Sequence, residues 1–153
     1  MKKHLFIIIA LTTLFFFGCD KSDMRERYVG LYNLNIQGIL NTTEPNGAKR
    51  SITWELTNQK LGIEKQPGIK NALVVNGYYE CDATIDESYI YCEPFTLIDT
   101  IEGIPMTLDL VPSKGFLNGE GVLTFDIIAT GTVQYENGSC PIEGGCRNTA
   151  TKQ

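Results

Sequence analysis

Histidine is almost absent from this sequence of 153 residues. The single one is His4, which lies in an N-terminal segment that we expect to be cleaved. A mature chain without histidine has neither a Ser-His-Asp nor a Cys-His arrangement for nucleophilic catalysis. The sequence also contains no G-x-S-x-G elbow, P-loop or G-x-G-x-x-G fingerprint. We therefore predict that the protein is not an enzyme, and a hydrolase that uses two carboxylates is the remaining catalytic alternative.

A basic excess is absent as well. The chain has 13 lysine and arginine residues against 18 aspartate and glutamate residues, which gives a formal net charge of −5. Nucleic-acid binding depends on lysine and arginine side chains that neutralise phosphates. We therefore expect no nucleic-acid partner.

The chain has no hydrophobic run long enough to cross a bilayer as a helix. The run at 5–17 follows Met1-Lys2-Lys3 and is shorter than the about 20 residues that a spanning helix needs. A positive start followed by a short apolar run is typical of a secretory signal peptide, which we place at residues 1–18. The run stops at Gly18-Cys19. This junction resembles a bacterial lipobox, in which the cysteine thiol is acylated and the cysteine becomes the mature N-terminus.

The lipobox resemblance predicts that Cys19 carries a diacylglycerol anchor, so that the membrane is one partner of the protein. The alternative is an ordinary signal peptide followed by an incidental cysteine. The stretch DKSDMRE after Cys19 is charged, and we interpret residues 19–27 as a lipidated tether. The folded domain is then expected at residues 28–153, a length typical of a single domain.

Four further cysteines remain, and an even number in an exported chain favours disulfides. A two-residue turn at 86–87 would place Cys81 opposite Cys92 in a hairpin. Cys140 and Cys146 flank a short segment with proline and glycine, which we interpret as a loop closed by a local bond. We therefore predict the pairs Cys81–Cys92 and Cys140–Cys146. A zinc site is the competing use of four cysteines, but the spacings do not match its usual short pairs, so we expect no metal or other cofactor.

Short runs of alternating apolar and polar residues, interrupted by Gly, Asn and Pro, cover the predicted domain. This pattern is typical of antiparallel strands, and no segment has convincing helical periodicity. We predict an all-β fold, a single antiparallel meander of about eight strands that closes into a β-barrel, with a β-sandwich as the alternative.

Aromatic side chains are candidates for lining a ligand cavity. A barrel of about eight strands has room inside for side chains or for one small ligand. We name Trp54, Tyr32 and Phe125 as candidate ligand-binding residues, with simple filling of the core as the alternative. Tyr89 and Tyr91 share the face opposite the predicted hairpin disulfide, and they would form a partner-binding surface if that bond points inward.

Several features together resemble small lipoproteins of the Bacteroidota: the lipobox, the short tether, the opening YVGLYNL, the strand start Gly119-Glu120-Gly121 and the terminal TATKQ. Those proteins carry lipocalin-like β-domains, and most have no assigned activity. The resemblance implies a lipocalin-like barrel on the outer membrane that faces the periplasm or the cell surface. Asp99-Thr100-Ile101 resembles an acceptor for O-glycosylation in the same group.

We therefore expect a lipid-anchored protein of the bacterial cell envelope whose β-domain binds rather than catalyses. The expected partner is a small apolar ligand or another protein, and an envelope inhibitor or adhesion module is the alternative. A ligand carrier requires a hollow apolar interior. An inhibitor or adhesion module requires exposed aromatic loops, and a hydrolase requires two convergent carboxylates in a cleft.

Overall fold

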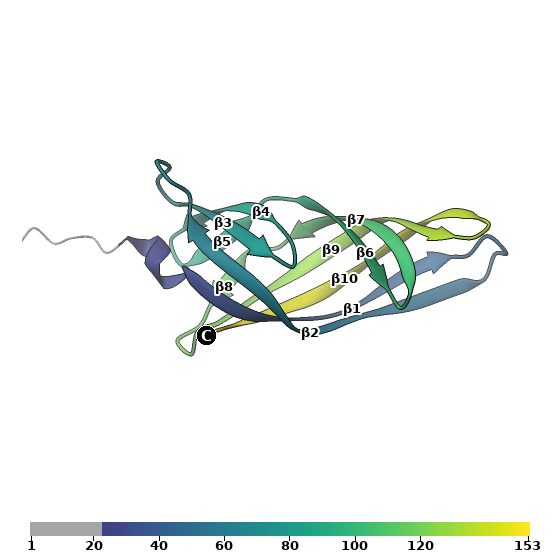
Figure 1. Ribbon diagram of the computed structural model, residues 1–153, viewed down its shortest axis with the longest axis horizontal. Coiled ribbons are helices and arrows are strands. Elements are labelled where there is room, and N and C mark those ends of the chain that lie inside the picture. Colours follow the sequence, from purple (N-terminus) through teal and green to yellow (C-terminus); the bar gives the residue numbers. More distant parts are fainter. Residues whose placement is uncertain (1–22) are drawn as a thin grey trace, which may run out of the picture.

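The structure is a computed structural model that describes residues 23–153, so the predicted signal peptide and Cys19 lie outside the described residues. It consists almost entirely of β-strands, with one short 3-10 helix, η1 (Met24–Arg27), before the first strand (Figure 1). The strands are β1 (Gly30–Thr43), β2 (Lys49–Lys65), β3 (Ala72–Gly77), β4 (Cys81–Asp86), β5 (Tyr89–Cys92), β6 (Phe95–Ile101), β7 (Ile104–Pro112), β8 (Gly115–Leu117), β9 (Val122–Tyr135) and β10 (Gly138–Lys152).

The ten strands form one antiparallel sheet in the order β10-β1-β2-β3-β4-β5-β8-β9-β7-β6. Because β10 also pairs with β9, the sheet closes in a ring, and β7 and β6 continue it from β9. The predicted all-β antiparallel fold is confirmed, and a closed ring is consistent with either a barrel or a sandwich. The chain is not a simple meander, however. Strands β5 and β8 are neighbours in the ring, but between them the chain forms the β6–β7 hairpin, which pairs with β9. This hairpin brings the strand number above the about eight that the sequence predicts.

Two long strands change their neighbour partway along. Strand β9 pairs with β8 at 123–124 and with β7 over 127–133. Strand β2 pairs with β3 over 61–65, whereas its first part, 49–59, pairs with β1 alone among the described residues. That part of β2 therefore faces the β6–β7 hairpin without a ladder between them among the described residues. The Thr53 N–H donates to the carboxylate of Glu102 in the β6–β7 turn, and Arg50 lies 3.8 Å from the same carboxylate. We call this junction the open seam.

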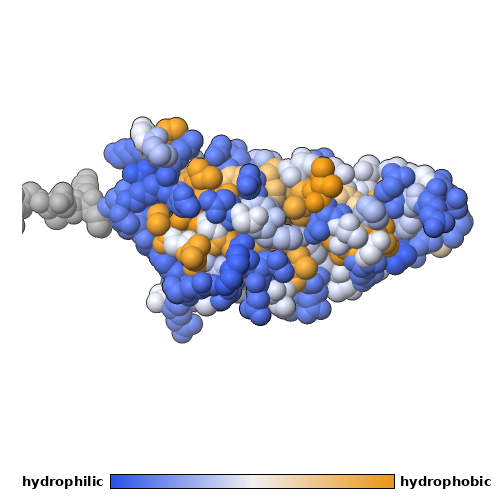
Figure 2. All heavy atoms as spheres, in the orientation of Figure 1, coloured by the Kyte–Doolittle hydropathy of each residue, from blue (hydrophilic) through white to orange (hydrophobic). Residues whose placement is uncertain are grey.

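The inward faces of the strands form one hydrophobic core. Along β1, the alternate residues Tyr32, Leu34 and Ile36 are at most 1 % exposed, because successive side chains of a strand point to opposite faces. Each fully buried large apolar side chain contributes about 1.5–3 kcal/mol relative to exposure. Outside the core, hydrophobic residues reach the surface in patches along the body, whereas the end formed by the β1–β2 and β9–β10 turns is mostly hydrophilic (Figure 2).

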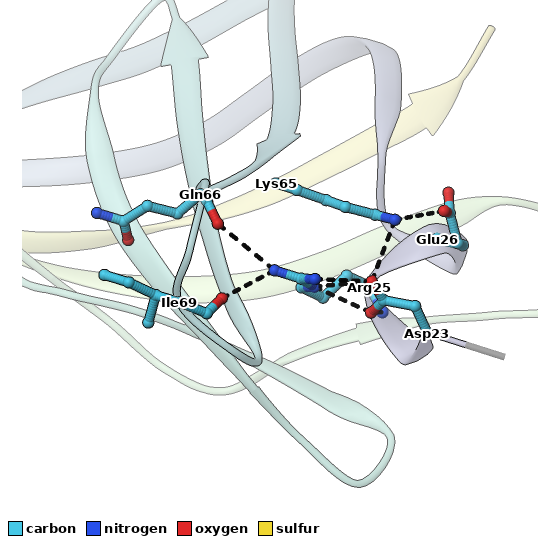
Figure 3. Close-up of polar contacts among 6 residues, drawn as sticks. All are labelled: Asp23, Arg25, Glu26, Lys65, Gln66 and Ile69. Atoms are coloured by element: carbon cyan, nitrogen blue, oxygen red, sulfur yellow. Dashed lines mark hydrogen bonds and ion pairs between the residues drawn. The ribbon is translucent and has the colours of Figure 1, made fainter. Parts of the chain in front are cut away.

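Charged side chains fix helix η1 to the end of β2 (Figure 3). Asp23 caps the helix by accepting a hydrogen bond from the Arg25 N–H at 3.1 Å. The Arg25 guanidinium donates to the Asp23 carboxylate and to the Ile69 carbonyl, in each case at 2.8 Å. Lys65 Nζ lies 3.1 Å from the same carboxylate. Hydrogen bonding by Arg25, with a smaller contribution from Lys65, holds the pKa of Asp23 well below its usual range.

The folded domain therefore includes Asp23 and does not begin near Tyr28 as predicted. The interpretation of 19–27 as a solvated tether is wrong for its last five residues. These residues look like a tether in the sequence because they are charged, yet their charges pair with Lys65, which is far away along the chain. Tyr28 itself is completely buried, and its hydroxyl donates to the Ser88 carbonyl at 2.6 Å.

Candidate functional site

The three predicted ligand-binding residues are all part of the core. Trp54, Tyr32 and Phe125 are 1 %, 0 % and 4 % exposed. The Tyr32 hydroxyl donates to the Tyr28 carbonyl at 2.6 Å, and burial raises the pKa of Tyr32 to about 12. None of the three lines either of the two hollows described below. These positions support the alternative interpretation, in which the aromatic side chains fill the core.

One buried polar residue stands out among these apolar neighbours. Asn148 lies opposite Ile36 on β1 and Phe125 on β9, and it is completely buried. Within residues 23–153, neither its amide nitrogen nor its amide oxygen has a hydrogen-bond partner. A buried amide without partners costs about 1–3 kcal/mol, so the interior retains unused hydrogen-bonding capacity at this point.

The β4–β5 hairpin brings Cys81 and Cys92 together in a register that differs from the prediction. The turn is at 87–88 rather than 86–87, and Cys92 lies opposite Ala83. A turn displaced by one residue shifts the register by two, which keeps both thiols on one face of the hairpin. Hydrogen bonding to Cys92, together with burial, raises the pKa of the Cys81 thiol. Both are free thiols in the structure, and their disulfide stays a prediction.

The predicted local bond between Cys140 and Cys146 is wrong. Both residues lie in β10, which pairs with β9 without a break from 138 to 151, so the segment between them is strand rather than loop. Six residues of strand span about 20 Å. A disulfide needs Cα atoms within about 7 Å. Both are buried free thiols, and burial raises the pKa of Cys146 to about 12.

Tyr89 and Tyr91 lie on the opposite face of β5 from the buried Ile90. Tyr91 is 39 % exposed. The Tyr89 ring centroid is 6.1 Å from that of Phe116 on β8, and Lys114 Nζ is 4.5 Å from the Tyr89 centroid. A partly exposed aromatic cluster therefore forms where β5 pairs with β8.

A row of aliphatic side chains across the outer face of four paired strands is the strongest candidate for a functional surface. Ile39 of β1 lies opposite Gly145 of β10, Gly145 lies opposite Ile128 of β9, and Ile128 lies opposite Val111 of β7. Ile39, Ile128 and Val111 are 57 %, 65 % and 49 % exposed. Directly opposite residues have Cβ atoms about 4.5–5.5 Å apart, so the three side chains lie on one line across the sheet. We call them the outer aliphatic row.

A shallow hollow of about 490 Å³ adjoins this row. Gly145 is part of its lining, and a Cβ at this position would lie 3.0 Å from the Ile127 carbonyl oxygen. Arg147 and Asp126 also line the hollow and form an ion pair, with Nε 2.8 Å from Oδ1, which lowers the pKa of Asp126. An apolar centre beside charged groups is the usual composition of a protein–protein interface.

The sequence does contain a signal for this row, although our sequence analysis missed it. Each member is next to a second apolar residue in its strand, at 39–40, 110–111 and 127–128. Two consecutive residues of a strand cannot both face the core, so one residue of each pair must point to solvent. The pairs alone do not show that the three outward residues are neighbours, because that depends on the register of four strands.

A second hollow, of about 810 Å³, lies among the residues that approach the β1–β2 and β9–β10 turns. Its lining is mainly polar and includes Arg50, Thr130 and Glu143. The hollow is open to solvent, so it lacks the enclosed apolar walls that most small-molecule sites have.

Within residues 23–153, no group of three or more His, Cys, Asp or Glu side chains is placed to hold a metal ion. In the same part of the chain, no helix is both long enough and apolar enough to cross a membrane. No protein-family model matches the chain, and no curated protein is significantly similar to it.

Proposed function

We propose that this is a lipid-anchored protein of the bacterial cell envelope whose β-domain binds a protein partner through the outer aliphatic row, without catalysis. The alignment of Ile39, Ile128 and Val111 across four paired strands carries the proposal. Exposed apolar surface with a polar surround is typical of sites where proteins meet. The Gly18-Cys19 junction supports the anchor.

The burial of the interior aromatic residues favours a protein partner over a small apolar ligand. Trp54 and Phe125 are packed in the core, where they contribute stability rather than contact area for a ligand. A small ligand is the second candidate, because the unpartnered amide of Asn148 would favour a molecule that offers hydrogen bonds. Such a ligand would be polar at that point, unlike the apolar ligand expected from the sequence.

Photo-crosslinking in cells tests the proposal. A photoreactive residue at Ile128 should form an adduct with one protein partner. Ile39→Lys should abolish that adduct, because it places a charge in the apolar centre of the interface. Thr132→Lys is the matched control, since Thr132 is exposed on the same strand and face as Ile128 but lies outside the row.

The absence of an adduct at Ile128, or an adduct that persists in the Ile39→Lys variant, would contradict the proposal. The same cells test the anchor. Cys19→Ser should release an unlipidated form or leave an unprocessed precursor, and an intact mass of the wild-type protein without an acyl addition at Cys19 would show that the anchor assignment is wrong.

A further inference from the structure

Two exposed apolar side chains lie on contacting segments at the end of the domain that contains η1. Met24 of η1 is 46 % exposed, and Ile69 of the β2–β3 loop is 51 % exposed. Arg25, which follows Met24 in the chain, donates to the Ile69 carbonyl at 2.8 Å, so this hydrogen bond joins the two segments. We call Met24 and Ile69 the apolar pair.

Hydrogen bonds hold the β2–β3 loop in its position. The Gln66 N–H donates to the Ala72 carbonyl at 3.1 Å and closes the loop, and the bond from Arg25 to Ile69 fastens its tip to η1. At Gly68, where φ is +76°, a Cβ would have no atom of the described residues within 4 Å. Figure 1 shows the loop extending from the body of the sheet at the end where η1 lies. The loop therefore presents its apolar residue to the surroundings in a fixed place.

The charged side chains of η1 are balanced by close partners (Figure 3). Asp23 pairs with Arg25 at 2.8 Å and with Lys65 at 3.1 Å, and Glu26 also pairs with Lys65. Two acidic and two basic groups therefore neutralise each other beside the apolar pair. Lys70 in the loop is exposed and belongs to none of the ion pairs within residues 23–153. A lysine can bury its apolar stem while its ammonium group stays in a polar layer.

The place of this surface in the chain indicates a lipid bilayer as its occupant. Cys19 precedes Asp23 by four residues, which span at most about 14 Å when extended. A lipid on Cys19 would therefore keep η1 near the bilayer, where a short tether makes even a weak contact frequent. The opposite end of the domain, formed by the β1–β2 and β9–β10 turns, is mostly hydrophilic (Figure 2). The exposed apolar residues thus lie at the end where a membrane would be within reach.

We propose that Met24 and Ile69 insert into the interfacial layer of the bilayer that carries the protein. The inference rests on the proposed lipid anchor and goes beyond it, because it assigns side chains of the folded domain to the membrane contact. Apolar side chains with a lysine beside them are a usual composition of surfaces that lie in this layer. Because the apolar side chains supply the contact, it needs no anionic lipid. Together with the anchor, it would fix the orientation of the domain on the membrane.

Quenching of tryptophan fluorescence by brominated lipid tests the contact. The mature chain, with a hexahistidine tag in place of Cys19, is held on phosphatidylcholine vesicles by a nickel-chelating lipid, with or without bromine on the acyl chains. Bromine should quench Ile69→Trp and Met24→Trp several-fold more strongly than the wild type, whose only tryptophan, Trp54, is buried. Glu136→Trp, in the β9–β10 turn at the opposite end, is the matched control and should be quenched no more than the wild type.

A second substitution separates insertion from mere proximity. In Met24→Trp, the added change Ile69→Asp should weaken the quenching about twofold or more, because a charge is costly in the apolar layer. Ile128→Asp in the same background should leave it unchanged, and circular dichroism shows whether the variants are folded. Quenching of Ile69→Trp no stronger than that of Glu136→Trp, or an equal effect of Ile69→Asp and Ile128→Asp, would overturn the proposal. Because the tag replaces the lipid, these results do not depend on the acylation of Cys19, which the intact mass tests separately.

Discussion

At positions 39 and 128, a large aliphatic side chain faces solvent, because the adjacent residue in the strand faces the core and successive side chains point to opposite faces. At position 145, between them in the sheet, glycine leaves the surface open. Single residues thus decide where the outside of this sheet is apolar and where it is hollow. The same alternation places Phe125 inside, at 4 % exposure, and Phe116 outside, at 48 % exposure.

These two phenylalanines give a matched test of the core. Phe125→Ala should lower the free energy of unfolding by about 3–5 kcal/mol, because it removes buried apolar surface and leaves a cavity. Phe116→Ala should lower it by about 1 kcal/mol or less, because much of that ring is already in water. Urea denaturation followed by Trp54 fluorescence measures both. Similar losses for the two variants would contradict the assignment of inward and outward faces.

Alternation was sufficient to predict the all-β fold, since strands follow from a period of two in the sequence. It was not sufficient for the outer aliphatic row or the open seam, which depend on which strands are neighbours and in what register. The contact of Lys65 with Asp23 could not be predicted for the same reason. Periodicity shows which face of a single strand is apolar, but it does not show which strands are neighbours.

At the scale of elements, β10 shows how a strand can resemble a loop in sequence. Pro141 lacks an N–H, but pairing with β1 stops at Ile142, so no β1 bond is lost. Gly144 is required by close approach, since a Cβ there would lie 2.1 Å from the Ile39 carbonyl oxygen. In the β4–β5 hairpin, the observed turn pairs Ile85 with Ile90, both buried, which explains why the register differs from the predicted one.

The cysteines test these two elements. Non-reducing peptide mapping of the protein should recover Cys81 joined to Cys92, because the hairpin holds their thiols together. Cys140 and Cys146 should be recovered as free thiols, because the strand between them keeps them apart. A Cys140–Cys146 bond would show that this part of β10 is a loop. Reduced Cys81 and Cys92 would show that the hairpin pair does not oxidise.

At the scale of the whole molecule, helix η1 contacts segments of the domain that are far from it along the chain. Arg25 binds the Ile69 carbonyl of the β2–β3 connection, and Arg27 donates to the Leu117 carbonyl of β8 at 2.9 Å. Cys19 precedes Asp23 by four residues, which span at most about 14 Å when extended. If Cys19 carries lipid, this end of the domain must stay close to the bilayer. The outer aliphatic row and the open seam belong to strands that lead away from it (Figure 1).

Chemical labelling of Ile128→Cys tests most directly the central claim that a protein partner covers the outer aliphatic row. In the purified domain, a maleimide should label this cysteine about as fast as Glu136→Cys in the exposed β9–β10 turn. In cells, the account predicts that labelling at position 128 becomes several-fold slower, whereas labelling at position 136 is unchanged. Equal labelling at position 128 in cells and in the purified domain would contradict the account.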